Sequence, residues 1–268
     1  SKLDEQLTPL SFTVDCKVSA NVNLKFSKET ASNMIGFIEG NDPVLKGEYI
    51  IVGAHFDHLG LGGRRSGSLK PDTLIIHNGA DDNASGTAGI LELSHKLMSN
   101  RHLLKRSVLV VCFDAEEKGL LGSKYYVKNP VRNLSNSAMM VNMDMIGRLN
   151  DNPVILGGVG SSGNFVNIIS DTRNSHTLEI ETNMGGMDFG RSDHASFYRE
   201  NIPVLFFFTG AHEDYHKPTD DWDKIDYKGE KKVLDFIYDL IINVSQLEEK
   251  PAFTEIETNT GNNQNPVF

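Results

Sequence analysis

The chain has 268 residues, of which 39% are hydrophobic, so it can bury a sizeable core in one large α/β domain or two small ones. Its formal net charge of −10 at pH 7 argues against a nucleic-acid-binding protein. No run of about 18 apolar residues occurs, so we also expect no membrane span.

The first ten residues, SKLDEQLTPL, contain no charged segment followed by an apolar one, and the chain does not begin with Met. We therefore expect a trimmed or mature chain. The two cysteines, Cys16 and Cys112, are too few for a disulfide framework. Cys112 lies in the apolar run SVLVVCFDA, which favours a buried thiol over a disulfide bridge.

Two stretches near the N-terminus alternate polar and apolar residues, as strands with one face in water do: 11–18 (SFTVDCKV) and 21–26 (NVNLKF). The stretch NMIGFIEG follows them at 33–40. Four later runs are almost continuously apolar, as expected for strands covered on both faces. These runs are 48–54 (EYIIVGA), 107–115 (SVLVVCFDA), 138–145 (AMMVNMDM) and 203–210 (PVLFFFTG).

Helical periodicity fills the intervals between these runs, at 86–98, 163–173 and 227–249. Strands that alternate with helices predict an α/β protein: a three-layer αβα sandwich with a mostly parallel, mixed central sheet. The early alternating strands are expected to extend one edge of that sheet. We expect a single domain over 1–268 that ends in a polar tail from about residue 252.

Side chains with metal-binding atoms follow every buried strand, and the carboxyl ends of parallel strands meet at one edge of a sheet. The groups are His55, Asp57 and His58, then Asp81 and Asp82 before the first long helix, Glu116 and Glu117, Asp144, and the segment HEDYH at 212–216. So many carboxylates in one place repel one another unless cations lie among them. Imidazole and carboxylate ligands without cysteine suit Zn²⁺ and also admit Co²⁺ or Mn²⁺.

Two short motifs suggest other sites. HEDYH matches the zinc motif H-E-x-x-H, which requires a helix, but Gly210 precedes it and Pro218 follows, so a helix is disfavoured and His216 remains as a ligand. GVGSSG at 158–163 fits the dinucleotide pattern G-x-G-x-x-G. Its place in the second half of the chain favours a structural turn over a nicotinamide site.

Six motifs, in order, resemble the co-catalytic di-zinc aminopeptidase family, which includes bacterial leucyl-type aminopeptidases and is grouped with glutamate carboxypeptidase-like enzymes. They are VGAHFDHLG, NGADDNASGTAG, CFDAEEKGLLGS, MVNMDMIG, GRSDHASF and DYHKPTD, and the similarity extends from about Asn33 to Asp226. The resemblance implies a zinc-exopeptidase fold, two Zn²⁺ ions, and a secreted or periplasmic location.

The resemblance also implies roles for individual residues. His55 and Asp144 would bind one zinc ion, Glu117 and His216 the other, and Asp81 would bridge both, with a cis peptide bond between Asp81 and Asp82. Glu116 would be the general base. Tyr215 matches a family tyrosine that stabilises the developing oxyanion. Apart from the resemblance, we expect Asp57 to orient His55 and Asp220 to orient His216, as carboxylates near metal-bound histidines commonly do, and Arg191 to help to hold the substrate.

The implied activity is removal of N-terminal residues from peptides with a free N-terminus, by a metal-bridged hydroxide that forms when Glu116 takes a proton from water. Three alternatives remain open. The same fold serves glutaminyl cyclases, which use a single zinc ion, and carboxypeptidases or dipeptidases. A catalytically silent binding module is a third possibility, of a different class.

Overall fold

The computed structural model describes residues 11–24, 28–182 and 192–256, in two units, Ser1–Thr30 and Ala31–Phe268. In the first unit the described residues form no helix or strand. The apolar side chains of Phe12, Val14 and Val18 are exposed. The strand predicted at 11–18 and the described part of the one at 21–26 are therefore wrong, because an alternating segment forms a stable strand only where a neighbouring strand and a core receive it.

The second unit contains a seven-stranded sheet in its described residues, in the order β1-β3-β2-β4-β7-β5-β6. The central strands β3, β2, β4 and β7 are parallel, while β1 pairs antiparallel with β3, and β5 pairs antiparallel with β7. The prediction of a mixed, mostly parallel sheet is confirmed. The strands are β1 (Met34–Ile38), β2 (Tyr49–His55), β3 (Ser107–Phe113), β4 (Ser137–Met143), β5 (Val154–Gly157), β6 (Ile180–Thr182) and β7 (Val204–Phe208).

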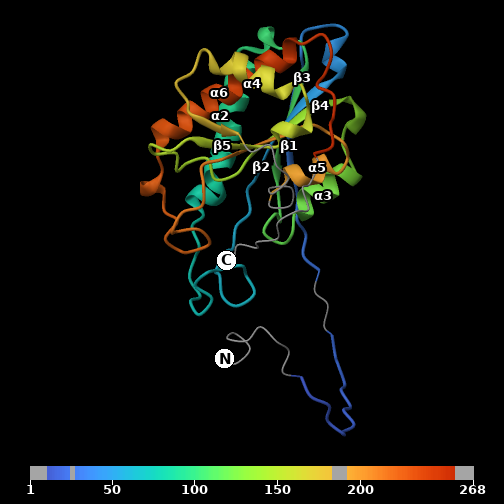
Figure 1. The fold of residues 1–268 in the computed structure, drawn as a ribbon, viewed down its shortest axis with the longest axis vertical. Helices are drawn as coiled ribbons and strands as arrows, with labels where there is room; N and C mark the ends of the chain where they lie inside the picture. The colour runs from blue at the N-terminus through green and yellow to red at the C-terminus, as the bar shows by residue number, and fades with distance from the viewer. Residues whose placement is uncertain (1–10, 25–27, 183–191, 257–268) are drawn as a thin grey trace. The chain divides into compact units, whose positions relative to one another are not determined.

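Helices cover both faces of the sheet, as Figure 1 shows, with α2, α4 and α6 on one side and α3 and α5 on the other. The helices are α2 (Gly86–Ser99), α3 (Leu121–Lys128), α4 (Phe165–Arg173), α5 (His194–Tyr198) and α6 (Tyr227–Gln246). Alternation along β2 explains the layers: Ile50 and Val52 pack in the core beneath α2 and α6, whereas Tyr49 and Ile51 pack with the α3 and α5 side chains. The three-layer sandwich is the predicted one.

The two short motifs that suggested other sites, GVGSSG at 158–163 and HEDYH at 212–216, form irregular structure, as expected. GVGSSG forms a turn and the short 3-10 helix η5 (Val159–Ser161), and Gly158 has φ of 78°. A Cβ on Gly158 would lie 2.3 Å from the Val204 carbonyl oxygen, so glycine is needed for this close contact. Residues 213–216 form turns and no helix. Both cysteines are free; Cys16 is exposed and Cys112 is half-buried.

No helix in the described part of the chain is both long and apolar enough to cross a bilayer. Of the predicted polar tail, residues 252–256 have no regular structure, and 257–268 lie outside the described residues.

Glu230 is a buried acid in the first turn of α6, with 7% of its surface exposed. Burial raises its pKa from the ordinary 4.5 to about 7, and the charges of Asp81 and Asp226 add to the shift. An acid whose pKa is higher in the folded state than in the unfolded state makes its full contribution to the free energy of unfolding at pH values below the unfolded-state pKa. That contribution is lost as the pH rises through the folded-state pKa.

We therefore expect the stability advantage of Glu230→Gln over wild type to grow by roughly 1–3 kcal/mol between pH 4.5 and pH 8. Urea unfolding across this range measures it. Glu92→Gln removes the same charge from an exposed position on α2 and should give no such trend. If the free energy of unfolding changed equally with pH in wild type and in Glu230→Gln, this account would be wrong.

Candidate metal centre

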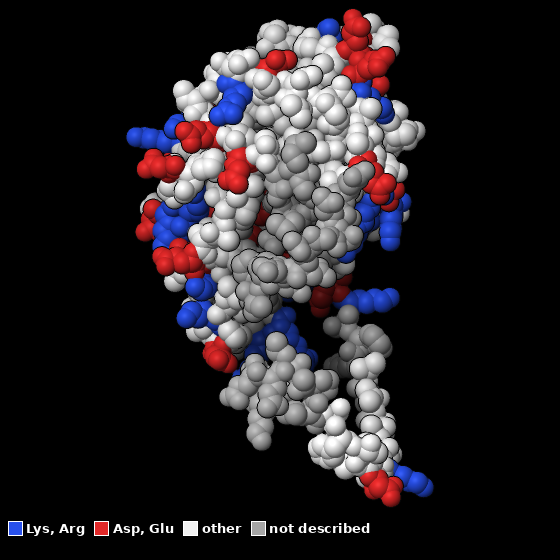
Figure 2. Space-filling view, in the orientation of Figure 1, with Lys and Arg blue, Asp and Glu red and all other residues white. Residues whose placement is uncertain are grey.

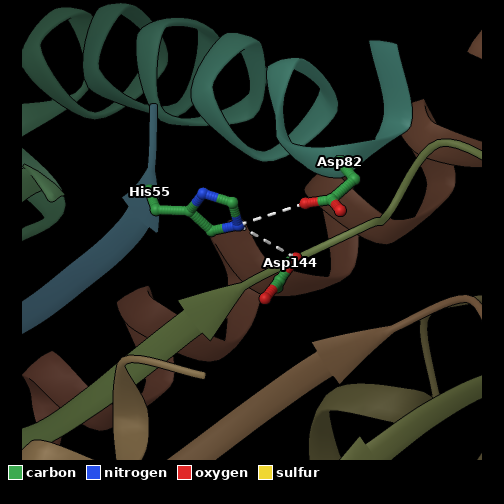
Figure 3. A group of neighbouring side chains, drawn as sticks. All are labelled: His55, Asp82 and Asp144. Atoms are coloured by element: carbon green, nitrogen blue, oxygen red, sulfur yellow. Dashed lines mark ion pairs between the residues drawn. The ribbon is translucent and has the colours of Figure 1, made fainter. Parts of the chain in front are cut away.

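Three ligand-type side chains from separate elements meet at the carboxyl edge of the sheet. His55 is the last residue of β2, Asp144 follows β4, and Asp82 lies in the π-helical turn η2 (Ala80–Ser85) before α2. Figure 3 shows the His55 ring pointing between the two carboxylates. His55 Nε2 is 3.3 Å from Asp82 Oδ1 and 3.4 Å from Asp144 Oδ1.

A second group forms around the other oxygen of Asp82. His216 Nε2 is 3.3 Å from Asp82 Oδ2 and 3.4 Å from Glu117 Oε2. His58 Nδ1 is 2.9 Å from Glu117 Oε1 and 3.9 Å from Asp82 Oδ2. Asp82 therefore belongs to both groups, with one carboxylate oxygen facing each.

These groups fit zinc. Ligand atoms bound about 2.0–2.2 Å from a tetrahedral zinc ion are roughly 3.3–3.5 Å apart, which matches the separations around His55 and His216. Asp82 Oδ2 is buried and has no hydrogen bond among the described residues. An ion between Asp82, Glu117 and His216 would satisfy this oxygen.

The backbone orients both histidines so that Nε2 faces the carboxylates. His55 Nδ1 lies 3.1 Å from the carbonyl oxygen of Asp57, and His216 Nδ1 lies 2.9 Å from that of Gly67. A ring nitrogen held by a carbonyl leaves the other nitrogen free to bind a metal. Asp57 was expected to orient His55, and its carbonyl, with its carboxylate 3.7 Å away, is placed to do so.

Asp57 also positions the paired glutamates. Its carboxylate accepts hydrogen bonds from the backbone nitrogens of Glu116 at 2.9 Å and Glu117 at 3.2 Å, in the turn that follows β3. Burial is the main cause that raises the pKa of Glu116 to about 9; His55 opposes the shift, and the charges of Asp144, Asp193 and Glu117 contribute to it. Glu116 is thus a half-buried carboxyl close enough to His55, Asp144 and Glu117 to feel their charges, as the proposed base must be.

The structure corrects the choice between the adjacent aspartates. Asp81, expected to bridge the metals, turns its carboxylate away: Oδ1 accepts from Gly147 N at 2.7 Å and Ser85 Oγ at 3.0 Å, and Oδ2 lies 3.2 Å from His212 Nε2. Asp82 occupies the shared position instead. The cis peptide bond joins Asp82 to Asn83 and not Asp81 to Asp82. Adjacent side chains in this turn point to opposite sides, so only one of the two can face both groups.

Asp220 also differs from its expected role. It was expected to orient His216, but its Oδ2 accepts hydrogen bonds from the backbone nitrogens of Asp81 and Asp82, at 2.9 and 3.0 Å. Its Oδ1 accepts from Arg148 at 2.7 Å. Asp220 therefore holds the aspartate turn, and the Gly67 carbonyl holds His216.

Of the remaining predicted residues, Tyr215 lies in the site and Arg191 lies outside the described residues. The Tyr215 ring stacks on His216 with 3.8 Å between ring centroids. Burial raises the pKa of its phenol, and the carboxylates of Asp82 and Glu117 add to the effect, so Tyr215 keeps its proton at neutral pH.

Three further residues lie around the centre to which the sequence assigned no specific role. His58 contacts Glu117, His212 contacts Asp81, and Asp193 is fully buried. Burial raises the pKa of Asp193 to about 7; His55 opposes the shift, and Asp144 and Asp57 add to it. His58 in HFDH and Asp193 in GRSDH lie in motifs that the sequence analysis had identified. The sequence alone does not show which residues they contact.

Comparison with known proteins places this geometry in a family. The sequence profile of Peptidase family M28 matches residues 33–241. The chain belongs to this family. It is 30% identical over 201 residues to Leucine aminopeptidase 2 of Arthroderma otae, which covers 72% of this chain and 37% of that protein. It is 27% identical to Aminopeptidase YwaD of Bacillus subtilis, covering 87% of this chain and 49% of the relative. The chain therefore spans a third to a half of the length of these two relatives.

Solved structures support the zinc-exopeptidase fold. BSAP, a zinc aminopeptidase from Bacillus subtilis, superposes with a TM-score of 0.64 at 23% identity, over 84% of this chain and 53% of that one. A glutaminyl cyclase from Bacteroides thetaiotaomicron superposes with a TM-score of 0.63 at 20% identity, over 80% and 77% of the two chains. The M28 fold is thus shared by a peptidase and a cyclase.

The shared position of Asp82 leads to a prediction about metal binding. We expect Asp82→Asn to weaken zinc binding at least tenfold, because both groups lose an anionic ligand. Asp81→Asn is the matched control, since the Asp81 carboxylate faces Gly147, Ser85 and His212 and pairs with neither His55 nor His216 among the described residues. Zinc retained after dialysis, measured by plasma mass spectrometry, distinguishes them. Greater zinc loss in Asp81→Asn than in Asp82→Asn would restore the original assignment.

Proposed function

We propose that this chain carries the catalytic centre of a zinc-dependent aminopeptidase, which hydrolyses the N-terminal residue from peptides through two metal ions. The observation that carries the proposal is the shared carboxylate of Asp82, with one oxygen facing His55 and Asp144 and the other facing Glu117 and His216. These five residues would hold the ions.

The charge balance supports two ions in place of one. Two divalent cations bring four positive charges, and Asp82, Glu117 and Asp144 supply three negative ones, so a hydroxide would complete neutrality. A single ion beside His55 would leave Glu117 and Asp82 Oδ2 with only the imidazoles of His58 and His216 for compensation. Asp81 does not enter this count, because its charge faces His212 and backbone amides.

The metal ions, when bound, would lower the pKa of a water molecule and polarise the scissile carbonyl. Glu116 takes the proton from the attacking water and returns it to the leaving amine. Divalent cations nearby would also counter the burial that raises the pKa of Glu116 to about 9, so that the carboxylate can act as a base near neutral pH. Tyr215, protonated and stacked on His216, is positioned to donate a hydrogen bond to the developing oxyanion.

The substrate class follows from the surplus of acidic groups. Once two ions balance Asp82, Glu117 and Asp144, the Glu116 carboxylate remains unmatched at the site, and its charge attracts the ammonium group of a free N-terminus. A polyanion would find net repulsion, since the formal net charge is −10, and along the side of the view that holds α6 Figure 2 shows Lys and Arg interleaved with Asp and Glu. Peptides with a free N-terminus are therefore the proposed substrates, and nucleic acids are not.

The division of labour between the two glutamates can be tested directly. We expect Glu116→Gln to lower kcat for leucine p-nitroanilide about 10²–10⁴-fold with zinc content unchanged, because only proton transfer is lost. Glu117→Gln should lose both activity and zinc. Kinetics and metal analysis on the same preparations measure both. Equal zinc loss in the two variants would show that Glu116 is a ligand.

A substrate panel separates the aminopeptidase from its relatives. We expect leucine p-nitroanilide to be cleaved, and its N-acetylated form to be inert, since acetylation removes the ammonium group. Removal of zinc with 1,10-phenanthroline should stop turnover, and added Zn²⁺ should restore it. Release of C-terminal residues from N-blocked peptides would instead indicate a carboxypeptidase, and conversion of N-terminal Gln peptides to pyroglutamyl products would indicate a cyclase.

A further inference from the structure

A cavity of about 820 Å³ lies between α2, α6 and the 3-10 helix η7 (Trp222–Lys224), and none of the proposed metal ligands lines it. Leu93, Ile225 and Leu234 contribute to its apolar lining. Its volume falls within the range of about 300–1,000 Å³ that is typical of small-molecule sites. A mostly apolar cavity with a few polar groups is the usual form of such a site.

One buried charged group in this lining has no partner among the described residues. Glu230 is 7% exposed, and no described residue gives its carboxylate a hydrogen bond or an ion pair. The two lysines in the lining are already paired: Lys96 lies 2.9 Å from one oxygen of Asp235, and Lys231 lies 2.5 Å from the other. Burial disfavours a charged carboxylate that has no protein partner, and a cation in the cavity would complement it.

The missing cation is not a divalent metal. Metal sites combine several ligand atoms, and the groups of metal-binding side chains found among the described residues do not include Glu230. Aromatic rings stand at the cavity instead: Trp222 is 72% exposed and Tyr227 is 58% exposed. Exposed aromatic rings in the same lining as a buried, unpaired carboxylate suit an organic ammonium group, which binds both by charge and by cation–π contact.

We propose that this cavity binds a small organic cation, with its ammonium group on Glu230 and its apolar body along Leu93, Ile225 and Leu234. Ser85 connects the cavity to the back of the aspartate turn: it lines the cavity, and its hydroxyl donates to the backbone oxygen of Asp81. The site is thus close to the metal centre but built from different residues.

The chain provides its own reporter, because Trp222 is its single tryptophan. We expect hexylammonium at pH 8 to change Trp222 fluorescence saturably, with a dissociation constant of about 1 mM or lower. At this pH Glu230 is ionised, since burial raises its pKa only to about 7. Hexanol has the same apolar body without the charge and should bind about tenfold more weakly.

Glu230→Gln should weaken hexylammonium binding about tenfold and leave hexanol binding unchanged. Glu92→Gln is the matched control, since Glu92 lines the same cavity but is exposed, and it should alter binding less than about twofold. Ala88→Leu places a larger side chain in the cavity from an exposed helical position and should abolish binding of both ligands.

Three results would overturn the proposal: no saturation up to about 10 mM ligand, equal hexylammonium affinity for wild type and Glu230→Gln, or unchanged binding to Ala88→Leu. If Glu230→Gln fails to fold, the comparison of hexylammonium with hexanol in wild type still tests the role of charge. Ala88→Leu still tests the location of the site.

Discussion

The metal centre depends on a carboxylate that does not face it. Asp220 Oδ2 accepts hydrogen bonds from the consecutive backbone nitrogens of Asp81 and Asp82, and this pair of bonds fixes the turn between the sheet and α2. With the backbone held there, Asp82 projects between the two ligand groups. Arg148 binds the other oxygen of Asp220 at 2.7 Å and offsets the cost of burying its charge.

The acidic groups at this edge fall into two layers with different means of compensation. In the layer behind the site, Asp220 accepts from backbone amides and Arg148, and Asp81 Oδ1 accepts from Gly147 N and Ser85 Oγ while its Oδ2 lies beside His212. In the layer that faces the site, the described residues offer Asp82, Glu117 and Asp144 imidazoles as their side-chain partners. The first layer has backbone and arginine donors, whereas the second is suited to additional positive charge. This difference explains why two adjacent aspartates have separate roles.

The residues that the sequence predicted well are those that obey local patterns. Apolar runs identify β2, β3, β4 and β7, and the position of a residue after a strand predicts that His55, Glu117, Asp144 and His216 lie together. The choice of Asp82 over Asp81 could not be predicted in this way, because it depends on Asp220, which is distant in sequence. The prediction of a strand at 11–18 was wrong for a related reason. An alternating segment forms an amphipathic strand only if a sheet edge is available to pair with it.

The fold alone does not identify the reaction, since a peptidase and a cyclase superpose on this chain almost equally well, with TM-scores of 0.64 and 0.63. The distinction lies in how the carboxylates are shared. A site for one ion requires a single group of ligands, and any further acid nearby would be paired with protein donors, as Asp81 is. Here Glu117 and the second oxygen of Asp82 instead face His216 at distances typical of ligands around a common ion. Two buried carboxylates that face imidazoles at these distances fit a second cation, and this fit supports the proposed two-metal hydrolase.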